Sequence, residues 1–447
     1  MDPMKRLGFP GVLLALTLLL TACPFQPPPP VSPTECPVGP MEVQEAEPLR
    51  LQGLGQFAGE YVPGELLVLP KPGLSLSVFR AEGAEPQEAL SRGFLRVRVP
   101  RGQEKARAQA LLRAGAQYVQ PNYLYRPLAV PNDPLYLPNQ KAYLNGLVGL
   151  EAAWNSSTGR GCPPLIAVLD TGILPHEDFQ TSKYLPRRVK LDVANQDEDP
   201  TDRLTDSSRG HGLMVAGVLA ADTNNRQGIA GITWGGYAIP IKVGLDNGVF
   251  STAYIAQGIR LARSLGVRVV NISLGGVGIY DAYLDAELAQ ARANGLVILA
   301  AAGNYSAPYT GYTSGGPVMF PASSTSVVAV GAVNSSRERA DFSAHGPELD
   351  LVAPGVNLAV LSPTNPQEYA SATGTSFASP VVAGVAALYM SRYASERKAW
   401  PTPDQVYLCL TATAEDLGNS GPDEEYGFGL VRADRIFSSA YASVCFP

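Results

Sequence analysis

The sequence carries little charge and very little histidine. Asp, Glu, Lys and Arg make up 17% of the 447 residues, and the formal net charge is −6 with no basic cluster. This balance disfavours nucleic acid as a partner, because nucleic-acid binding needs a basic surface. The only histidines are His176, His211 and His345, so chemistry that depends on a histidine has few candidates.

Long apolar runs are also scarce. Residues 11–20 are apolar but too short to span a bilayer well, and they follow the basic pair Lys5-Arg6, as in an export signal. The run ends in Leu-Thr-Ala-Cys at residues 20–23, which resembles the lipobox of bacterial lipoproteins. We therefore expect a signal peptide over residues 1–22 and acyl chains on Cys23 that anchor the protein to a membrane. The alternative is an ordinary secretion signal followed by an incidental cysteine.

Proline and cysteine shape the next segment. Residues 23–48 are predicted to be a linker, because the run PFQPPPPVSP favours extended polyproline. An exported location permits disulfides, and four cysteines allow three sets of pairs. The four that remain after Cys23 are Cys36, Cys162, Cys409 and Cys445. We favour a bond between the last two, since both lie within about forty residues of the C-terminal end, and leave the other pairings open.

Residues 49–129 carry a small pattern of their own. The expected elements are strands over 64–70 and 94–100, a helix over 102–115 and an extended segment over 116–128. In the second strand, apolar residues alternate with arginines, which is typical of a strand with one wet face. Three prolines among residues 127–134 mark the end of the pattern. The segment is therefore predicted to be a small α+β domain.

From residue 130 to 447 the pattern changes to short, continuously apolar runs. The expected strands are 165–170, 238–243, 267–273, 296–303 and 326–333, and the expected helices are 211–221, 251–265 and 281–293. Continuous apolar runs are typical of strands buried on both faces, and their alternation with helices predicts a mostly parallel α/β sheet with helices on both faces. Ligands of such sheets gather beyond the carboxyl ends of the strands.

Polar residues stand at several of those ends. Asp170 ends one strand, Asn304 follows another, and His211 opens a helix. A further helix is expected from Ser376, with Pro380 in its first turn, which would place the hydroxyl at a positive helix end. A serine nucleophile needs a base, a carboxylate that orients the base, and donors for the oxyanion. These four residues supply each part.

Each residue alone has an ordinary structural explanation. The serine is suited to a helix N-cap, the aspartate to a turn, the histidine to a structural contact and the asparagine to a left-handed turn. Their joint occurrence at strand ends and helix starts favours the catalytic interpretation. The chain order Asp, His, Ser is also one that serine hydrolases use.

Several segments resemble the subtilisin-like serine proteases. The aspartate, histidine and serine motifs of that family match VLDTG (168–172), GHGLMVAG (210–217) and GTSFASPVVAG (374–384). Further matches are LAAAGN (299–304), VNISLGG (270–276), FPAS (320–323), DLVAPG (350–355) and YGFGLVRA (426–433). The resemblance covers residues 131–435. One departure is Leu213-Met214, where the family usually has Thr-His, which puts local packing in doubt.

The resemblance implies a subtilisin-like fold and a serine endopeptidase that needs no cofactor for its chemistry. It makes Asp170, His211 and Ser376 the triad and Asn304 an oxyanion donor. It also makes residues 49–129 a propeptide that inhibits the enzyme and is cut off, although a permanent N-terminal domain is an alternative. Substrate contacts are then expected from Ser273, Leu274, Gly275, Ala301 and Gly303, around a roomy apolar pocket.

A structural calcium ion is a further implication of the resemblance. The positions that correspond to its ligands are Gln140, Asp178, Asn225, Gln227 and Ile229. Oxygen ligands of this kind suit calcium. The alternative is that the asparagine-rich loop at 224–231 is simply solvated.

Together these features predict an exported, self-processed serine endopeptidase, either membrane-anchored as a lipoprotein or secreted. Its expected partners are polypeptide substrates, its own propeptide and a membrane. A non-catalytic surface protein that binds peptides on the same fold is the main alternative. An esterase of the doubly wound hydrolase fold is disfavoured, because Ser376 does not lie in a Gly-x-Ser-x-Gly turn. The natural substrate, the cleavage site and the membrane face stay open.

Overall fold

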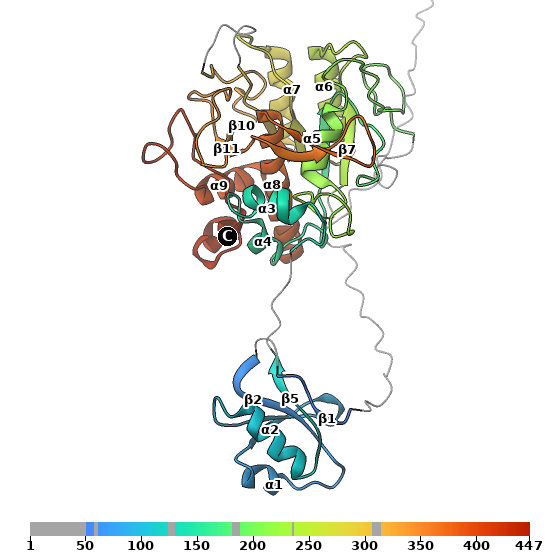
Figure 1. The fold of residues 1–447 in the computed structure, drawn as a ribbon. Coiled ribbons are helices and arrows are strands. Elements are labelled where there is room, and N and C mark those ends of the chain that lie inside the picture. The colour runs from blue at the N-terminus through green and yellow to red at the C-terminus, as the bar shows by residue number, and fades with distance from the viewer. Residues whose placement is uncertain (1–50, 58–60, 124–129, 181–187, 235–236, 306–313) are drawn as a thin grey trace, which may run out of the picture. The chain divides into compact units, whose positions relative to one another are not determined.

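The structure is a computed structural model of the full chain, and it describes residues 51–57, 61–123, 130–180, 188–234, 237–305 and 314–447. The predicted signal peptide, the linker with Cys23, and Cys36 lie outside the described residues. The described residues form two compact units, one within residues 37–129 and the other from residue 130 onward (Figure 1). Each unit is described by itself below.

The smaller unit is a five-stranded sheet with two helices. In spatial order its strands are β1 (Gly53–Leu54), β5 (Ala116–Tyr123), β2 (Tyr61–Pro70), β4 (Leu95–Arg98) and β3 (Glu85–Ala89), and its helices are α1 (Leu76–Ala81) and α2 (Glu104–Arg113). Val97 of β4 is fully buried, whereas Arg96 points outward and pairs with Glu65 at 3.1 Å, as the alternation predicted. The sequence analysis missed β3, because its residues are mostly polar and exposed.

The larger unit is built on a six-stranded sheet in which every pairing is parallel. In spatial order the strands are β11 (Leu351–Pro354), β10 (Val328–Val333), β9 (Val297–Ala301), β8 (Val269–Ile272), β6 (Leu165–Asp170) and β7 (Tyr237–Lys242). Almost all of their residues are buried, which explains why the sequence is continuously apolar there. The predicted parallel α/β fold is confirmed.

Helices cover both faces of this sheet. Four long helices are α5 (His211–Ala220), α6 (Thr252–Ser264), α7 (Ala282–Ala293) and α8 (Thr375–Arg397). Connections between parallel strands are right-handed crossovers. The connection from β6 through α5 to β7 runs in one direction across the sheet, and the connections through α6 and α7 run in the other direction. For this reason α5 lies on the face opposite to α6 and α7. Accordingly, α5 packs against α8, and α6 packs against α7 (Figure 1).

The order of the strands reverses beside β6. From β6 the chain moves to β7 on one side, and it then returns to β8 on the other side. Such a switch point leaves a crevice at the carboxyl ends of the two strands between which the order reverses. Asp170 is the last residue of β6, and Ser273 directly follows β8, so both lie at this crevice.

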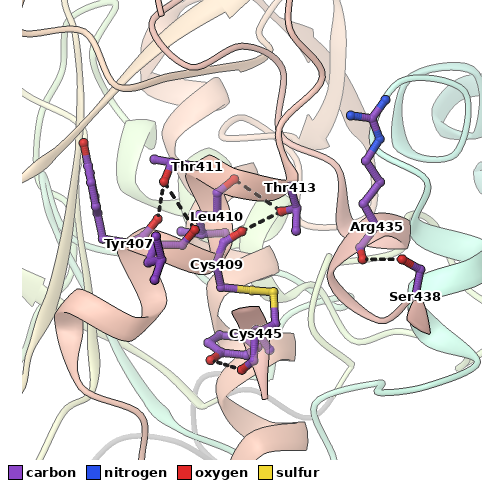
Figure 2. The surroundings of a disulfide bond; sticks show 10 residues. Tyr407, Cys409, Leu410, Thr411, Thr413, Arg435, Ser438 and Cys445 are labelled. Carbon is purple, nitrogen blue, oxygen red and sulfur yellow. Dashed lines mark hydrogen bonds between the residues drawn. A yellow bond between two sulfur atoms is a disulfide. The ribbon is translucent and has the colours of Figure 1, made fainter. Parts of the chain in front are cut away.

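A disulfide joins two of the C-terminal helices, α9 and α11. The remaining described elements of this unit are a π-turn at Tyr136–Gln140, α3 (Lys141–Leu144), α4 (Leu150–Trp154), β12 (Leu358–Leu361), β13 (Tyr369–Ala372), α9 (Pro403–Thr413), α10 (Ala433–Ile436), a 3₁₀ helix at Ser439–Tyr441 and α11 (Ala442–Cys445). Cys409 of α9 bonds Cys445 of α11, which confirms the favoured pairing (Figure 2). Within the described residues, none of the helices combines the length and the apolar character that a bilayer span requires.

Candidate active site

The switch point brings the predicted aspartate and histidine into direct contact. His211 Nδ1 and Asp170 Oδ1 lie 2.8 Å apart. The backbone N–H of Thr171 donates to the same carboxylate oxygen at 2.7 Å. Asp170 is buried and the His211 ring is 24% exposed, so the carboxylate is shielded while one edge of the imidazole faces outward.

A glycine allows the start of α5 to dock against the end of β6. A Cβ on Gly212 would lie 2.1 Å from the carbonyl oxygen of Gly172 and 3.1 Å from Cβ of Asp170. Only glycine permits so close an approach. The Gly212 N–H donates to the hydroxyl of Thr171 at 3.1 Å, which locks the helix start to the strand end. The unusual Leu213 beside it is fully buried in the core.

A second buried carboxylate, which the sequence analysis missed, supports this pair. Asp202 accepts hydrogen bonds from the Thr171 hydroxyl and from the Gly210 N–H, each at 2.7 Å, and from the Leu204 N–H at 2.9 Å. It therefore ties the end of β6 to the residue before His211. The sequence offered no signal for it, because its role depends on a loop that returns to the strand end.

Ser376 lies in the first turn of α8, and it is not the N-cap. Gly374 is the N-cap, and Pro380 is the sixth helical residue and thus lies in the second turn, not in the first as predicted. Proline has no N–H, so the carbonyl of Ser376 lacks its helical donor. The hydroxyl of Ser273 donates to that carbonyl instead at 2.9 Å. The proline thus leaves an acceptor that ties the serine turn to the end of β8.

The side chains of His211 and Ser376 lie on neighbouring helices. The ring of His211 and the ring of Phe377, the residue after the serine, have centroids 5.6 Å apart. With Nδ1 bound to Asp170, Nε2 is the nitrogen that remains for a substrate-side partner. The Ser376 hydroxyl donates to the carbonyl of Ser273 at 3.4 Å. The structure therefore gathers Asp170, His211 and Ser376 at one edge of the sheet.

Asn304 is fixed to the same helix start. Its Oδ1 accepts from the Thr375 N–H at 2.8 Å and from the Thr375 hydroxyl at 3.0 Å, so it caps α8 from outside the helix. Because Oδ1 is held by these bonds, the Nδ2 amide group is oriented away from Thr375. The backbone N–H of Ser376 belongs to the first helical turn, where N–H groups have no intrahelical acceptor. That these two groups donate to one anion stays a prediction.

This arrangement can be compared with known proteins. A family model described as "Subtilase family" matches residues 161–429. The chain is 36% identical over 308 residues to the "Thermostable alkaline protease" of Halalkalibacterium halodurans, covering 68% of this chain and 73% of that protein.

The chain belongs to the subtilase family.

Similarities to other serine proteases agree with the assignment to this family. Subtilisin DY of Bacillus licheniformis is 36% identical over 278 residues, covering 62% of this chain and 91% of that protein. The "Halolysin-like extracellular serine protease Nep" of Natrialba magadii is 34% identical, and the match spans 79% of this chain and 62% of that protein. Among solved structures, a protease of Pseudoalteromonas arctica has a TM-score of 0.58 and 28% identity, covering 70% of this chain and 100% of that one.

The residues predicted to contact substrate lie along two walls beside the serine of this subtilase. One wall follows β8, where Ser273 is buried and Leu274 and Gly275 are more accessible. The other wall follows β9, with Ala301 at the strand end and Gly303 donating to Thr375 Oγ1 at 3.2 Å. The side chain of Met319, which the prediction of a roomy pocket did not consider, packs beside both glycines.

The residues predicted to bind calcium are brought together, and the side-chain oxygens of three of them accept hydrogen bonds. Asp178 is fully buried, and its two oxygens accept from Asn225 Nδ2 at 2.7 Å and from the Ile229 N–H at 3.0 Å. Gln140 Oε1 accepts from the Ala230 N–H at 2.7 Å. Asn225 Oδ1 accepts from the Gln227 N–H at 2.8 Å.

N–H groups point at the side-chain oxygens of Asp178, Gln140 and Asn225, but an oxygen that accepts one hydrogen bond keeps a second lone pair, so calcium binding here stays a prediction. The described residues also contain no group of three or more His, Cys, Asp or Glu side chains placed to hold a metal. Hydrogen bonds hold the loop at residues 224–231 in place, and no step below depends on a cation.

The surroundings of His211 favour its protonated form. Burial of the ring lowers its pKa, but the charge of Asp170, the hydrogen bond to Asp170 and the charge of Asp202 outweigh burial. The pKa of His211 is therefore raised above its ordinary value of about 6.5. A general base must be neutral, so a raised pKa would set the acid limit of any reaction in which His211 accepted the proton.

We expect kcat/KM for a peptide anilide to fall as the pH drops through a pKa above about 6.5. In Asp202→Asn this acid limb should move to lower pH, because one of the charges that stabilise the imidazolium is gone. The measurement is the pH profile of kcat/KM. Asp206→Asn is the matched control, since it removes the same charge from an exposed position of the same loop. Equal shifts in both variants would contradict the assignment to Asp202.

Proposed function

We propose that this subtilase is an endopeptidase that hydrolyses polypeptides through Ser376, His211, Asp170 and Asn304. The observation that supports this best is the 2.8 Å contact between His211 Nδ1 and Asp170 Oδ1 at the switch point of the sheet. It fixes the tautomer that leaves Nε2 unprotonated and able to take a proton. The same crevice holds a serine at a helix start, as acyl transfer requires.

In the proposed reaction, Ser376 Oγ attacks the carbonyl carbon of the scissile bond, and its proton passes to His211 Nε2. The imidazolium that forms is stabilised by the Asp170 carboxylate. Negative charge develops on the carbonyl oxygen, where the Ser376 N–H and Asn304 Nδ2 donate hydrogen bonds. The C–N bond then breaks as Nε2 returns its proton to the leaving amine. Water enters by the same steps and releases the acyl group from Ser376.

The substrate backbone is proposed to lie along the wall after β8. Leu274 and Gly275 offer backbone groups at an accessible edge, where an extended peptide can add as a further strand. The wall after β9, with Ala301 and Gly303, faces it. Hydrogen bonds tie one wall to the Ser376 carbonyl and the other to the Thr375 hydroxyl, so both walls are held to the helix turn that carries the nucleophile.

The direct test of the proposed function is hydrolysis of casein by the purified protein, with and without a serine-directed fluorophosphonate. We expect hydrolysis that the fluorophosphonate abolishes. Binding of casein peptides without hydrolysis would instead favour a non-catalytic peptide-binding protein. Hydrolysis that resists the reagent would exclude a serine mechanism.

The smaller unit is proposed to be a propeptide, and residues 49–129 are proposed to be removed by the enzyme itself. Its compact fold, separate from the larger unit in the chain, is what an inhibitory domain needs in order to fold before it is cut off. Export is proposed from the apolar run at residues 11–20, and anchoring from Cys23.

Cys23→Ser is expected to release the protein from membranes while its peptidase activity stays intact. Cleavage before Cys23 would make it the first mature residue, and its acyl chains would be the anchor. The measurement is the distribution of protein between membrane and soluble fractions, together with the mass of the N-terminal peptide.

Cys36→Ser is the control for this prediction, because it removes a neighbouring cysteine outside the lipobox-like segment. It should stay with the membranes. An unmodified Cys23, or equal membrane fractions for wild type and Cys23→Ser, would contradict the lipid anchor.

A further inference from the structure

A methionine that the sequence analysis did not single out lies between the two substrate walls. The Met319 N–H donates to the carbonyl of Ala302, next to Gly303, at 2.8 Å. The next residue, Phe320, accepts from the Gly276 N–H at 2.8 Å and donates to the Gly276 carbonyl at 3.3 Å. The backbone at 319–320 therefore bridges the wall after β8 and the wall after β9.

The side chain of Met319 occupies the space that glycine leaves on each wall. A Cβ placed on Gly303 would lie 2.5 Å from Cγ of Met319, 2.7 Å from its Sδ and 3.0 Å from its Cε. A Cβ placed on Gly275 would lie 3.1 Å from Cβ of Met319 and 3.7 Å from Sδ. These distances place the methionine side chain directly beside both glycines.

The surroundings of Met319 are apolar. Its side chain is buried, with 9% of the residue exposed, and the two walls that the backbone at 319–320 bridges include Leu274, Gly275, Ala301 and Gly303. None of these wall residues carries a charge or a side-chain hydrogen-bonding group. A charged substrate side chain placed here would lose its hydration without gaining a partner.

We propose that Met319 forms the floor of the pocket for the substrate side chain before the cleaved bond, and that it restricts this position to small uncharged residues such as alanine. The proposal rests on the proposed function, because it assigns the substrate class of the same site. The physical reason is volume: the space between the glycines that a large side chain would fill already holds the thioether. One methylene in such a pocket changes kcat/KM by about 10-fold to 200-fold.

The test compares two peptide anilides, Ala-Ala-Pro-Ala and Ala-Ala-Pro-Phe p-nitroanilide. For the wild type we expect kcat/KM to favour the alanine substrate by at least about 10-fold. Met319→Gly should lower this ratio by at least about 10-fold, by gaining activity on the phenylalanine substrate. Met319→Leu keeps a side chain of similar volume and should keep the wild-type ratio. A wild type that prefers phenylalanine, or a ratio unchanged in Met319→Gly, would overturn the proposal.

A binding measurement separates this proposal from the proposed function. The free acids Ala-Ala-Pro-Ala and Ala-Ala-Pro-Phe can be titrated by calorimetry, which does not depend on turnover. We expect Met319→Gly to tighten binding of the phenylalanine peptide about 10-fold or more, relative to the alanine peptide. If the protein does not hydrolyse peptides but Met319→Gly shows this shift in binding, the proposed catalytic function is wrong and the proposed pocket holds. If the protein hydrolyses peptides but Met319→Gly changes neither the rate ratio nor the relative binding of the two peptides, only the proposed pocket is wrong.

Discussion

Ser376→Ala is expected to abolish peptidase activity and to leave a precursor that is still joined through residues 115–135. Under the proposed mechanism the same hydroxyl cleaves substrates and the chain's own propeptide. Loss of the triad serine in subtilisin lowers kcat by about 10⁶-fold, and we expect a loss of that order. The measurements are the hydrolysis rate of a peptide anilide and the mass of the pure recombinant protein.

Ser371→Ala is the matched control for this variant. It removes a hydroxyl five residues earlier in the chain, from an exposed position of β13. It should mature and hydrolyse peptides as the wild type does. A pure Ser376→Ala protein that matures normally would exclude self-processing, and residual activity near the wild-type level would remove Ser376 from the mechanism.

Asn304→Ala is expected to lower kcat by about 10² to 10³, the range found for loss of the subtilisin oxyanion asparagine. The amide is expected to act on the developing charge, so kcat should fall more than KM rises. Asn304→Ala also removes the acceptor that caps the Thr375 N–H. A lost cap lowers the free energy of unfolding by about 1 kcal/mol.

Asn304→Asp separates the two roles of this side chain. The carboxylate keeps an acceptor for the Thr375 N–H and hydroxyl but has no N–H to donate to an oxyanion. We expect Asn304→Asp to be at least as slow as Asn304→Ala while it unfolds at nearly the wild-type temperature. A kcat close to wild type in either variant would place Asn304 outside the oxyanion hole.

The parallel sheet could be predicted from the sequence, because strands that are buried on both faces have continuously apolar sequences. The strand that ends at Asp170 has the predicted bounds, and the helix that starts at His211 ends within one residue of its prediction. β11 was not predicted as a strand, although its four residues are all buried. Local patterns are strong where each residue faces the core, and weak in short or solvated elements.

The site was only partly predictable, since some of its parts depend on chain segments far apart in sequence. Asp170, His211, Ser376 and Asn304 have local signatures at strand ends and helix starts. Asp202 has none, because its role comes from a loop that folds back onto Thr171 and Gly210. The position of Met319 beside Gly275 and Gly303 was likewise hidden, since it comes from another segment of the chain.

The most direct test of the proposed serine mechanism is to find which residue a fluorophosphonate modifies. Purified protein would be treated with the reagent, digested, and analysed by peptide mass spectrometry. We expect one adduct, on Ser376. The yield of this adduct should be strongly reduced in His211→Ala, because the hydroxyl then lacks its base. No adduct, or an adduct on another serine in a protein that hydrolyses casein, would contradict the assignment of Ser376 as the nucleophile.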